Sequence, residues 1–430
     1  MHLNTSEQTT APSDPVPPDN DNISMRDAGK VHLESTNWLK QKMLLFPKII
    51  PVSIIFLYAI YSFSYATGNK YLDYKIILIF SFLTSLSLFV KKQPLFSKTV
   101  VGLFLLFLGL SSFSVFVPFS EYANIDWLIQ SVAILLLCTP IVAGFANYDK
   151  KDTPIFKWGL FACLLTLGLM VILYQLGIPI KEVFPEFAGF KPVTHSWNQK
   201  YYSFWLLFLM WGTISFYWGK NIRGISLTIG LMTLTAIAIF TGYSDSAKVA
   251  FIFSVIIFML MHIRSNRWLL WWQSLIVIYI FALPLIWILL PSRWLDLINF
   301  IDLNNIGFRL DVYNFSASAI LNQWFLGYGF GSTLSLPYPR VTGGHPHNIV
   351  FLFWLELGIL GAILLALIAI KLTAFINNHD QGNMSAAWAI LTSGLIIFSF
   401  SFDIWLPGVV LTYCMWLAMI ILARHASVKF

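Results

Sequence analysis

The stretch GGHPHNIVFLFWLELGILG, residues 343–361, decides the fold of this chain because it places a polar turn directly before an apolar helix. His345 and His347 lie in the turn, and the apolar run that follows is long enough to cross a bilayer. Gly358 and Gly361 lack side chains, so one face of this helix is predicted to approach a neighbour closely. Protonatable rings at a membrane–water boundary predict chemistry on a lipid-bound substrate.

Outside this stretch, the composition is that of a polytopic membrane protein. Hydrophobic residues make up 57% of the chain, charged residues make up 11%, and the mean hydropathy is +0.72. Apolar runs able to span a hydrocarbon core of roughly 30 Å recur along the chain, so the predicted fold class is all-α with about 12 transmembrane helices. The predicted spans are 49–66, 76–90, 99–119, 127–145, 158–177, 201–219, 225–243, 249–263, 274–291, 349–372, 386–406 and 407–423.

The two ends of the chain are polar. Residues 1–47 contain no apolar run, so a disordered tail is predicted there. Residues 48–423 are predicted to form one transmembrane domain, and residues 424–430 follow it as a short C-terminal segment.

The distribution of positive charge predicts the orientation. Most of the 27 lysines and arginines fall in the N-terminal tail and in alternate short loops, which places both termini in the cytoplasm by the positive-inside rule. The net charge of +7 therefore follows the topology, and nucleic acid is not an expected partner. The loop 292–348 then lies outside, and it is too long to be a simple connection.

Two pieces of this outer loop, residues 292–303 and 309–325, have the apolar spacing of amphipathic helices. Arg309 begins the second piece, where free backbone N–H groups and the helix dipole favour an anion. A guanidinium there can bind two phosphate oxygens in a fork geometry. The alternative is a surface arginine that pairs with Asp311 or with lipid headgroups. The glycine-rich run 327–331 that follows is a weak candidate for a phosphate-binding turn.

Further polar side chains are predicted near the outer face of the membrane. Carboxylates inside spans are costly, so Glu356 and Asp403 have either a functional role or a structural partner. Lys248 is either a phosphate-binding cation or an ordinary lysine at the end of a span. His195 and Lys200 lie in the same predicted outer loop as Lys191. The candidate substrate-binding residues are Lys191, Lys248, Arg340, His345, Asn348, Glu356 and Asp403.

No redox, metal or nucleotide motif stands out in the sequence. Cys138, Cys163 and Cys414 all lie within apolar runs and are predicted to be buried thiols. His345 and His347 have no third ligand nearby in the sequence, so neither a metal nor another cofactor is expected.

Residues 347–361, HNIVFLFWLELGILG, resemble the H-[N/S/Q]-x9-G-x-x-[G/T/Y] motif of bacterial O-antigen ligases. Arg309 is similar to the arginine that opens the re-entrant stretch of that family, and FLGYGFG at residues 325–331 is similar to its L-G-x-G-x-G run. The predicted spans and the long outer loop before the motif also resemble the topology of the family.

The resemblance implies an inner-membrane enzyme that transfers a glycan from undecaprenyl diphosphate to lipid A–core at the periplasmic face. It implies His347 as the base that takes the acceptor proton and Arg309 as a cation that holds the departing diphosphate, with inversion and without a metal. The chain departs from the family at residues 243–248, YSDSAK, where Asp245 takes the place of an arginine and Lys248 supplies a cation one turn later.

Other interpretations remain open. An O-antigen polymerase of the same superfamily uses a second lipid-linked glycan as the acceptor, and a protein O-oligosaccharyltransferase uses a serine or threonine. The chain shows no extra soluble domain that would hold a protein acceptor, which favours a ligase. Outside the enzymes, a twelve-helix transporter is the main alternative, although paired halves with spans broken at matching positions are not found.

Overall fold

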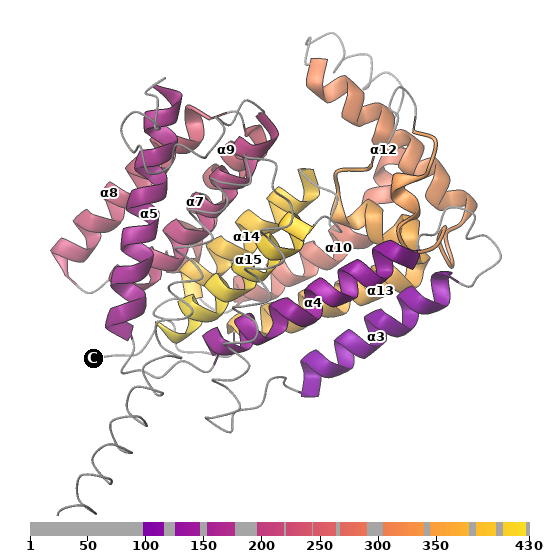
Figure 1. The fold of residues 1–430 in the computed structure, drawn as a ribbon, viewed down its shortest axis with the longest axis horizontal. Helices are drawn as coiled ribbons and strands as arrows, with labels where there is room; N and C mark the ends of the chain where they lie inside the picture. The colour runs from indigo at the N-terminus through magenta and orange to yellow at the C-terminus, as the bar shows by residue number, and fades with distance from the viewer. Residues whose placement is uncertain are drawn as a thin grey trace, which may run out of the picture. The chain divides into compact units, whose positions relative to one another are not determined.

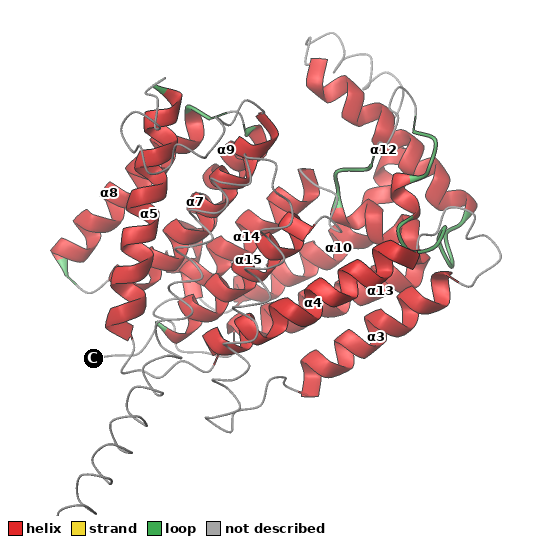
Figure 2. Ribbon diagram, in the orientation of Figure 1, coloured by secondary structure: helices red, strands yellow, loops and turns green. Residues whose placement is uncertain are grey.

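The computed structural model of the chain describes residues from 98 onward, in segments separated by gaps (Figure 1). Within these segments every regular element is a helix and none is a strand, which confirms the all-α class (Figure 2). The tail and the predicted spans 49–66 and 76–90 lie outside the described residues, so the number of spans stays a prediction. The described residues are 98–115, 125–146, 153–176, 196–218, 221–242, 244–263, 267–289, 304–338, 345–377, 384–400 and 407–426.

The described helices follow the predicted apolar runs, with shifts at their ends. The predicted span 249–263 begins earlier, at Asp245, because Ser244 caps its first turn by accepting the backbone N–H of Ala247. The helices are α3 (Lys98–Val115), α4 (Ile125–Ala146), α5 (Thr153–Gln175), α7 (Ser196–Tyr217), α8 (Ile222–Phe240), α9 (Asp245–Ile263), α10 (Arg267–Leu289), α12 (Asn304–Asn322), α13 (Ile349–Asn377), α14 (Met384–Phe400) and α15 (Pro407–His425).

Five of the described helices are long and apolar enough to cross a membrane. These five helices are α5, α8, α9, α10 and α13. Helix α12 differs, because its sequence NNIGFRLDVYNFSASAILN mixes polar and apolar residues within the predicted outer loop. The segments that meet the length and hydropathy of a span are Phe156–Leu173, Ile222–Phe240, Asp245–His262, Leu270–Leu289 and Ile349–Asn377.

Helix α7 lies in the centre of the packing. Every side chain from Tyr202 to Tyr217 is buried, as expected for a helix that is apolar all round. It packs against α5, α8, α9, α14 and α15. Trp205 and Trp211 of α7 and Trp388 of α14 are among the largest fully buried side chains. Van der Waals packing of such side chains holds helices together where lipid removes most of the hydrophobic driving force.

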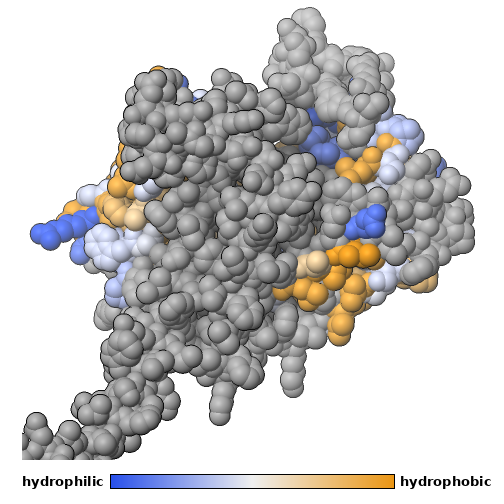
Figure 3. Space-filling model, viewed as in Figure 1, coloured by the Kyte–Doolittle hydropathy of each residue, from blue (hydrophilic) through white to orange (hydrophobic). Residues whose placement is uncertain are grey.

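The outward faces of several helices are apolar as well. In Figure 3 an apolar patch lies where Figure 1 places α3, whose exposed side chains include Leu105, Leu106 and Phe113. Helix α9 exposes large apolar side chains at three- and four-residue spacing, among them Ile252, Ile256 and Met259. Apolar stripes of this size on the outside of a bundle are typical of helices that face lipid.

Helix α13 is broken at Gly358, where φ is 61° and ψ is −148°. The loop after α12 docks at this break, and the backbone N–H of Ile359 donates to the carbonyl oxygen of Trp324 at 2.8 Å. Only glycine readily adopts such a conformation, and a Cβ at Gly358 would collide with the backbone of Phe325. The predicted close approach is therefore present, but Gly358 meets a loop and Gly361 meets the first part of α13 itself, rather than another helix.

Candidate functional site

The turn before α13 brings two imidazole rings together. The ring centroids of His345 and His347 are 3.8 Å apart, and the backbone N–H of His347 donates to Nδ1 of His345 at 3.3 Å. His347 has a φ of 49°, a left-handed conformation that is uncommon for residues with a side chain and that clusters at functional sites. Both residues are half-buried, so the turn fixes the His347 backbone while solvent still reaches the pair.

His345 is a neutral ring whose tautomer is set by this turn. Burial lowers its pKa from 6.5 to about 3, and the adjacent His347 shifts that pKa in the same direction. Because Nδ1 accepts a hydrogen bond, the proton of the neutral ring lies on Nε2. His345 therefore positions His347 and does not itself act as an acid or base near neutral pH.

The lowered pKa of His345 makes the stability of the chain depend on pH. The unfolded chain protonates this ring near pH 6.5, whereas the folded chain protonates it only near pH 3. The neutral ring therefore stabilises the fold fully above about pH 6.5, and this contribution is lost as the pH falls toward about 3. We expect the melting temperature in detergent to fall across this window, and His345→Asn to flatten the fall, because asparagine accepts the same N–H without titrating. An equal pH slope in the variant would contradict the role of His345.

Asn348 ties the histidine turn to two other helices. It is 2% exposed, and its Oδ1 accepts the backbone N–H groups of Val350 and Phe351 as the cap of α13. Its Nδ2 donates to the Tyr279 hydroxyl of α10 at 3.2 Å and to the Ser399 carbonyl of α14 at 3.0 Å. All polar atoms of this side chain are therefore used inside the protein. Asn348 orients the turn and is not placed to bind substrate.

Replacing Asn348 by aspartate should lower the melting temperature of the chain. The carboxylate still caps α13 but cannot donate to Tyr279 and Ser399, and it brings a buried negative charge next to the Ser399 carbonyl oxygen. A buried group that loses its partner costs roughly 1–3 kcal/mol, and a charged one costs more. The matched control is Asn221→Asp at the exposed cap of α8, where the side chain only accepts the N–H of Gly224, so little loss is expected. Equal losses in both variants would contradict this role of the Asn348 amide.

Arg309 lies in the second turn of α12 and not at its start. The prediction that Arg309 begins the helix is wrong, because α12 begins at Asn304 and the unpaired N–H groups of its first turn belong to earlier residues. Burial raises the pKa of the Tyr313 hydroxyl, and the Arg309 guanidinium opposes this rise, as expected for side chains one turn apart. The Tyr313 hydroxyl donates to the Ser399 carbonyl at 3.4 Å, the same oxygen that accepts from Asn348. Tyr313, one turn after Arg309, and Asn348, the neighbour of His347, thus share one buried acceptor.

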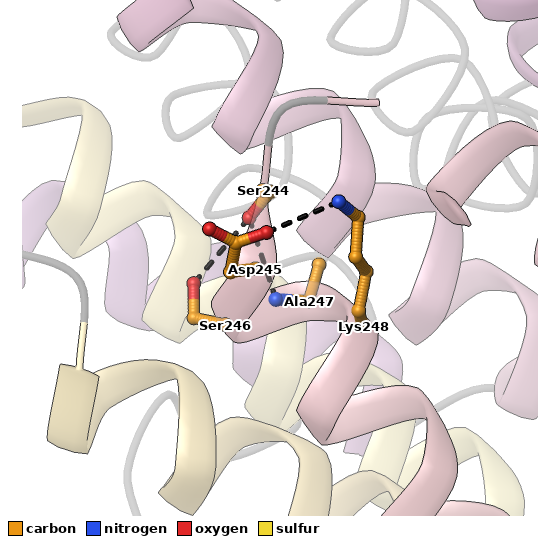
Figure 4. A network of polar contacts seen from close by, with 5 residues as sticks. All are labelled: Ser244, Asp245, Ser246, Ala247 and Lys248. Atoms are coloured by element: carbon orange, nitrogen blue, oxygen red, sulfur yellow. Dashed lines mark hydrogen bonds and ion pairs between the residues drawn. The ribbon is translucent and has the colours of Figure 1, made fainter. Parts of the chain in front are cut away.

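Lys248 is already paired on its own helix. Its Nζ lies 3.0 Å from Oδ1 of Asp245, which is three residues earlier, and Figure 4 shows the lysine side chain reaching back to that carboxylate. Ser244 and Ser246 are buried beside this pair, with their hydroxyl oxygens 3.3 Å apart. The Asp245 side chain is 82% exposed, so the ion pair itself adds little stability. The pair places the Asp245 carboxylate next to the Lys248 ammonium, which the sequence predicted as a candidate phosphate-binding cation.

Lys200 is the cation whose position the sequence did not reveal. It lies in the second turn of α7, where a loop had been predicted, and it is half-buried. Burial lowers its pKa, the Arg309 guanidinium lowers it further, and the Asp245 carboxylate raises it. These interactions place Lys200 within electrostatic reach of α9 and α12. No local signal marks it, because the partners are brought together only by the packing of separate helices.

Glu356 is a structural carboxylate in this arrangement. It is fully buried, and its Oε1 accepts a hydrogen bond from the Thr333 hydroxyl at 2.7 Å. Its backbone oxygen accepts the N–H of Gly329, so it fixes the loop after α12 twice. The four successive backbone N–H groups of residues 327–330 all donate to protein atoms. The glycine-rich run therefore docks the loop onto α13, and these N–H groups are not available to a phosphate.

Several predicted site residues lie outside the described residues, and the placed ones do not gather a metal site. In the described segments from 98 to 426, no group of three or more histidine, cysteine, aspartate or glutamate side chains comes together. Cys163 and Cys414 are buried thiols, as predicted, whereas the Cys138 side chain is not among those described. The candidates outside the described residues are Lys191, His195, Arg340 and Asp403.

Several of these residues lie in a segment that matches a known protein family. Residues 230–366 match the family model described as O-antigen ligase. Over this segment the chain is similar to the O-antigen ligase family. The matched domain runs from α8 into α13 and includes Asp245, Arg309 and His347, whereas Lys200 lies before it. The resemblance of the histidine motif is thereby confirmed at the level of the family.

Curated relatives carry names of the same kind. A protein of Rickettsia felis named "Putative polysaccharide ligase" is 33% identical over 113 residues, which cover 23% of this chain and 27% of the relative. A protein of Rickettsia conorii named "Putative polysaccharide ligase RC0486" is 31% identical over 114 residues, with the same coverage of 23% and 27%. The match thus spans about a quarter of the length of these relatives. No solved structure matches the chain.

Proposed function

We propose that the chain is an O-antigen ligase that transfers a glycan from undecaprenyl diphosphate to lipid A–core on the periplasmic face of the bacterial inner membrane. The observation that carries this proposal is that the Ser399 carbonyl accepts from Asn348, the neighbour of His347, and from Tyr313, one turn after Arg309. The residues that carry a half-buried imidazole and a half-buried guanidinium thereby flank this shared acceptor, and both lie within the segment that matches the ligase family. A base and a cation are the two groups that such a transfer requires.

The proposed reaction is a single displacement. His347 takes the proton of the acceptor hydroxyl, and the oxygen attacks the anomeric carbon as the bond from that carbon to the diphosphate oxygen breaks. The diphosphate leaves with the electron pair, and Arg309 stabilises its charge through two parallel hydrogen bonds. The anomeric centre is inverted because one displacement occurs. His345 holds His347 in place, and the unperturbed pKa of histidine, about 6.5, suits a base at neutral pH.

The topology is part of the proposal. We place both termini in the cytoplasm and about 12 spans in the membrane, so that α12 and the histidine turn face the periplasm. The five candidate spans and the apolar outward faces support a membrane location. Membrane lipids then surround the helices, and the lipid-linked donor reaches the site from the outer leaflet.

The lipopolysaccharide pattern of a strain that lacks the gene tests the acceptor. A ligase predicts lipid A–core without O-polysaccharide, together with accumulated long lipid-linked polymer, and expression of the chain should restore the ladder. A pattern in which lipid A–core carries a single repeat unit would instead assign an O-antigen polymerase. An unchanged ladder with unglycosylated pilin would assign a protein O-oligosaccharyltransferase. An unchanged ladder with normal glycoproteins and altered uptake of a solute would favour a transporter.

A further inference from the structure

A tyrosine of α10 contacts the residue that follows His347. The Asn348 amide donates from Nδ2 to the Tyr279 hydroxyl oxygen at 3.2 Å and to the Ser399 carbonyl oxygen at 3.0 Å. A primary amide carries two N–H donors, so each of these acceptors takes one of them. Tyr279 lies 69 residues before Asn348 in the chain, and the packing of α10 against α13 brings its hydroxyl to the histidine turn.

The backbone around Tyr279 is fixed by other contacts. The Trp354 indole of α13 donates from Nε1 to the carbonyl oxygen of Ile280 at 2.9 Å, and its ring meets the ring of Phe281 edge-on with centroids 6.3 Å apart. The ring of Tyr279 is half-buried and packs against the apolar cluster that includes Ile280 and Trp354. Removal of the Tyr279 hydroxyl should therefore leave α10 packed on α13 and change only the contact with Asn348.

The histidine turn is held on both sides of His347. Before it, Nδ1 of His345 accepts the His347 backbone N–H at 3.3 Å. After it, the Asn348 amide is fixed at both ends, because its oxygen accepts two backbone N–H groups of α13 and its nitrogen donates to Tyr279 and to a carbonyl of α14. The φ of 49° at His347 is a conformation that persists only where the surroundings hold it, so the direction of its imidazole depends on these neighbours.

We propose that Tyr279 is a positioning residue for the base of the transfer, because its hydroxyl fixes the Asn348 amide and the amide fixes the direction of the His347 imidazole. This inference deepens the proposed function and rests on it, since His347 is the base of that reaction. Without the hydroxyl, one N–H of the amide loses its acceptor and the turn gains freedom to move. A small displacement of a reacting group lowers the rate steeply.

Tyr279→Phe tests this role, because phenylalanine keeps the ring and removes the hydroxyl. In reconstituted vesicles, kcat of glycan transfer should fall roughly tenfold to a hundredfold, whereas KM for the lipid-linked donor should change less than about twofold. The matched control is Tyr217→Phe at the end of α7, which removes a buried hydroxyl that has no hydrogen-bond partner among the described residues and should keep full transfer. An unchanged kcat in Tyr279→Phe, a rise in KM alone, or an equal loss in Tyr217→Phe would overturn the proposal.

A double variant separates positioning from direct contact with the substrate. Asn348→Ser keeps an oxygen that can cap α13 but has no amide N–H for Tyr279 to accept. If Tyr279 acts through Asn348, adding Tyr279→Phe to Asn348→Ser should lower kcat by less than about twofold further. Losses that multiply in the double variant would show that Tyr279 acts independently of the amide, and they would refute the proposal.

The ring signals of His347 in nuclear magnetic resonance give a readout that does not depend on transfer. In histidine-labelled protein in detergent, these signals are assigned by their loss in His347→Asn. They should shift or broaden in Tyr279→Phe and stay in place in Tyr217→Phe, and unmoved signals in Tyr279→Phe would contradict the positioning role. A shift in a protein that transfers no glycan would keep the effect of Tyr279 on the turn and remove the ligase. Full transfer by Tyr279→Phe would remove the positioning role and leave the ligase.

Discussion

Replacing His347 by alanine is expected to reduce glycan transfer by about 100- to 10,000-fold, while the protein accumulates in the membrane at its normal level. The expected loss is that of the base which takes the acceptor proton. The backbone N–H of His347 donates to Nδ1 of His345, and the alanine variant retains this donor. The measurement is the rate of transfer from a lipid-linked donor to lipid A–core in reconstituted vesicles.

The backbone conformation of His347 calls for a second variant. At a φ of 49°, alanine is strained, whereas asparagine tolerates the left-handed region and has no basic nitrogen. His347→Asn should therefore lose transfer to the same extent as His347→Ala. Recovery of transfer in the asparagine variant would show that the residue acts through the shape of the turn and not as a base.

Replacing Gly358 by alanine is expected to detach the loop after α12 and to abolish transfer. A Cβ at this position would collide with backbone atoms of Phe325 and would lie 2.8 Å from the backbone nitrogen of Gly327, and backbone cannot move aside as a flexible side chain can. The φ of 61° and ψ of −148° add a strain of about 1–3 kcal/mol for a residue with a side chain. We expect a lower melting temperature, faster proteolysis within residues 323–338, and loss of transfer, because the loop holds α12 and Arg309 against α13.

Gly230→Ala is the matched control for Gly358→Ala. Gly230 lies within α8, and a Cβ there would meet nothing within 4 Å. Alanine is a better helix former than glycine, so this variant should melt at the same or a slightly higher temperature and should keep full transfer. The same melting temperature for both variants would refute the role of Gly358 in the break.

The apolar runs and the histidine motif could be predicted from the sequence because each depends on residues that lie close together in the chain. The described helices follow the predicted spans, and the match over residues 230–366 confirms the family that the motif indicated. The first residue of α12 was harder to predict. The apolar spacing placed the start of this helix at Arg309, whereas α12 begins at Asn304. Local polar residues can extend a helix without changing its apolar spacing.

The sequence by itself determined that the chain is helical, that it contains apolar segments of membrane-spanning length, and that His347 lies just before the start of one of these segments. Only the tertiary structure decided that Gly358 breaks α13 to receive a loop, that Asn348 and Tyr313 share the Ser399 carbonyl, and that Lys248 pairs with Asp245. The physical reason is that helix formation and hydrophobicity are local properties of the chain. The electrostatic field at a site depends on which helices pack together, and residues far apart in the chain then supply its charges.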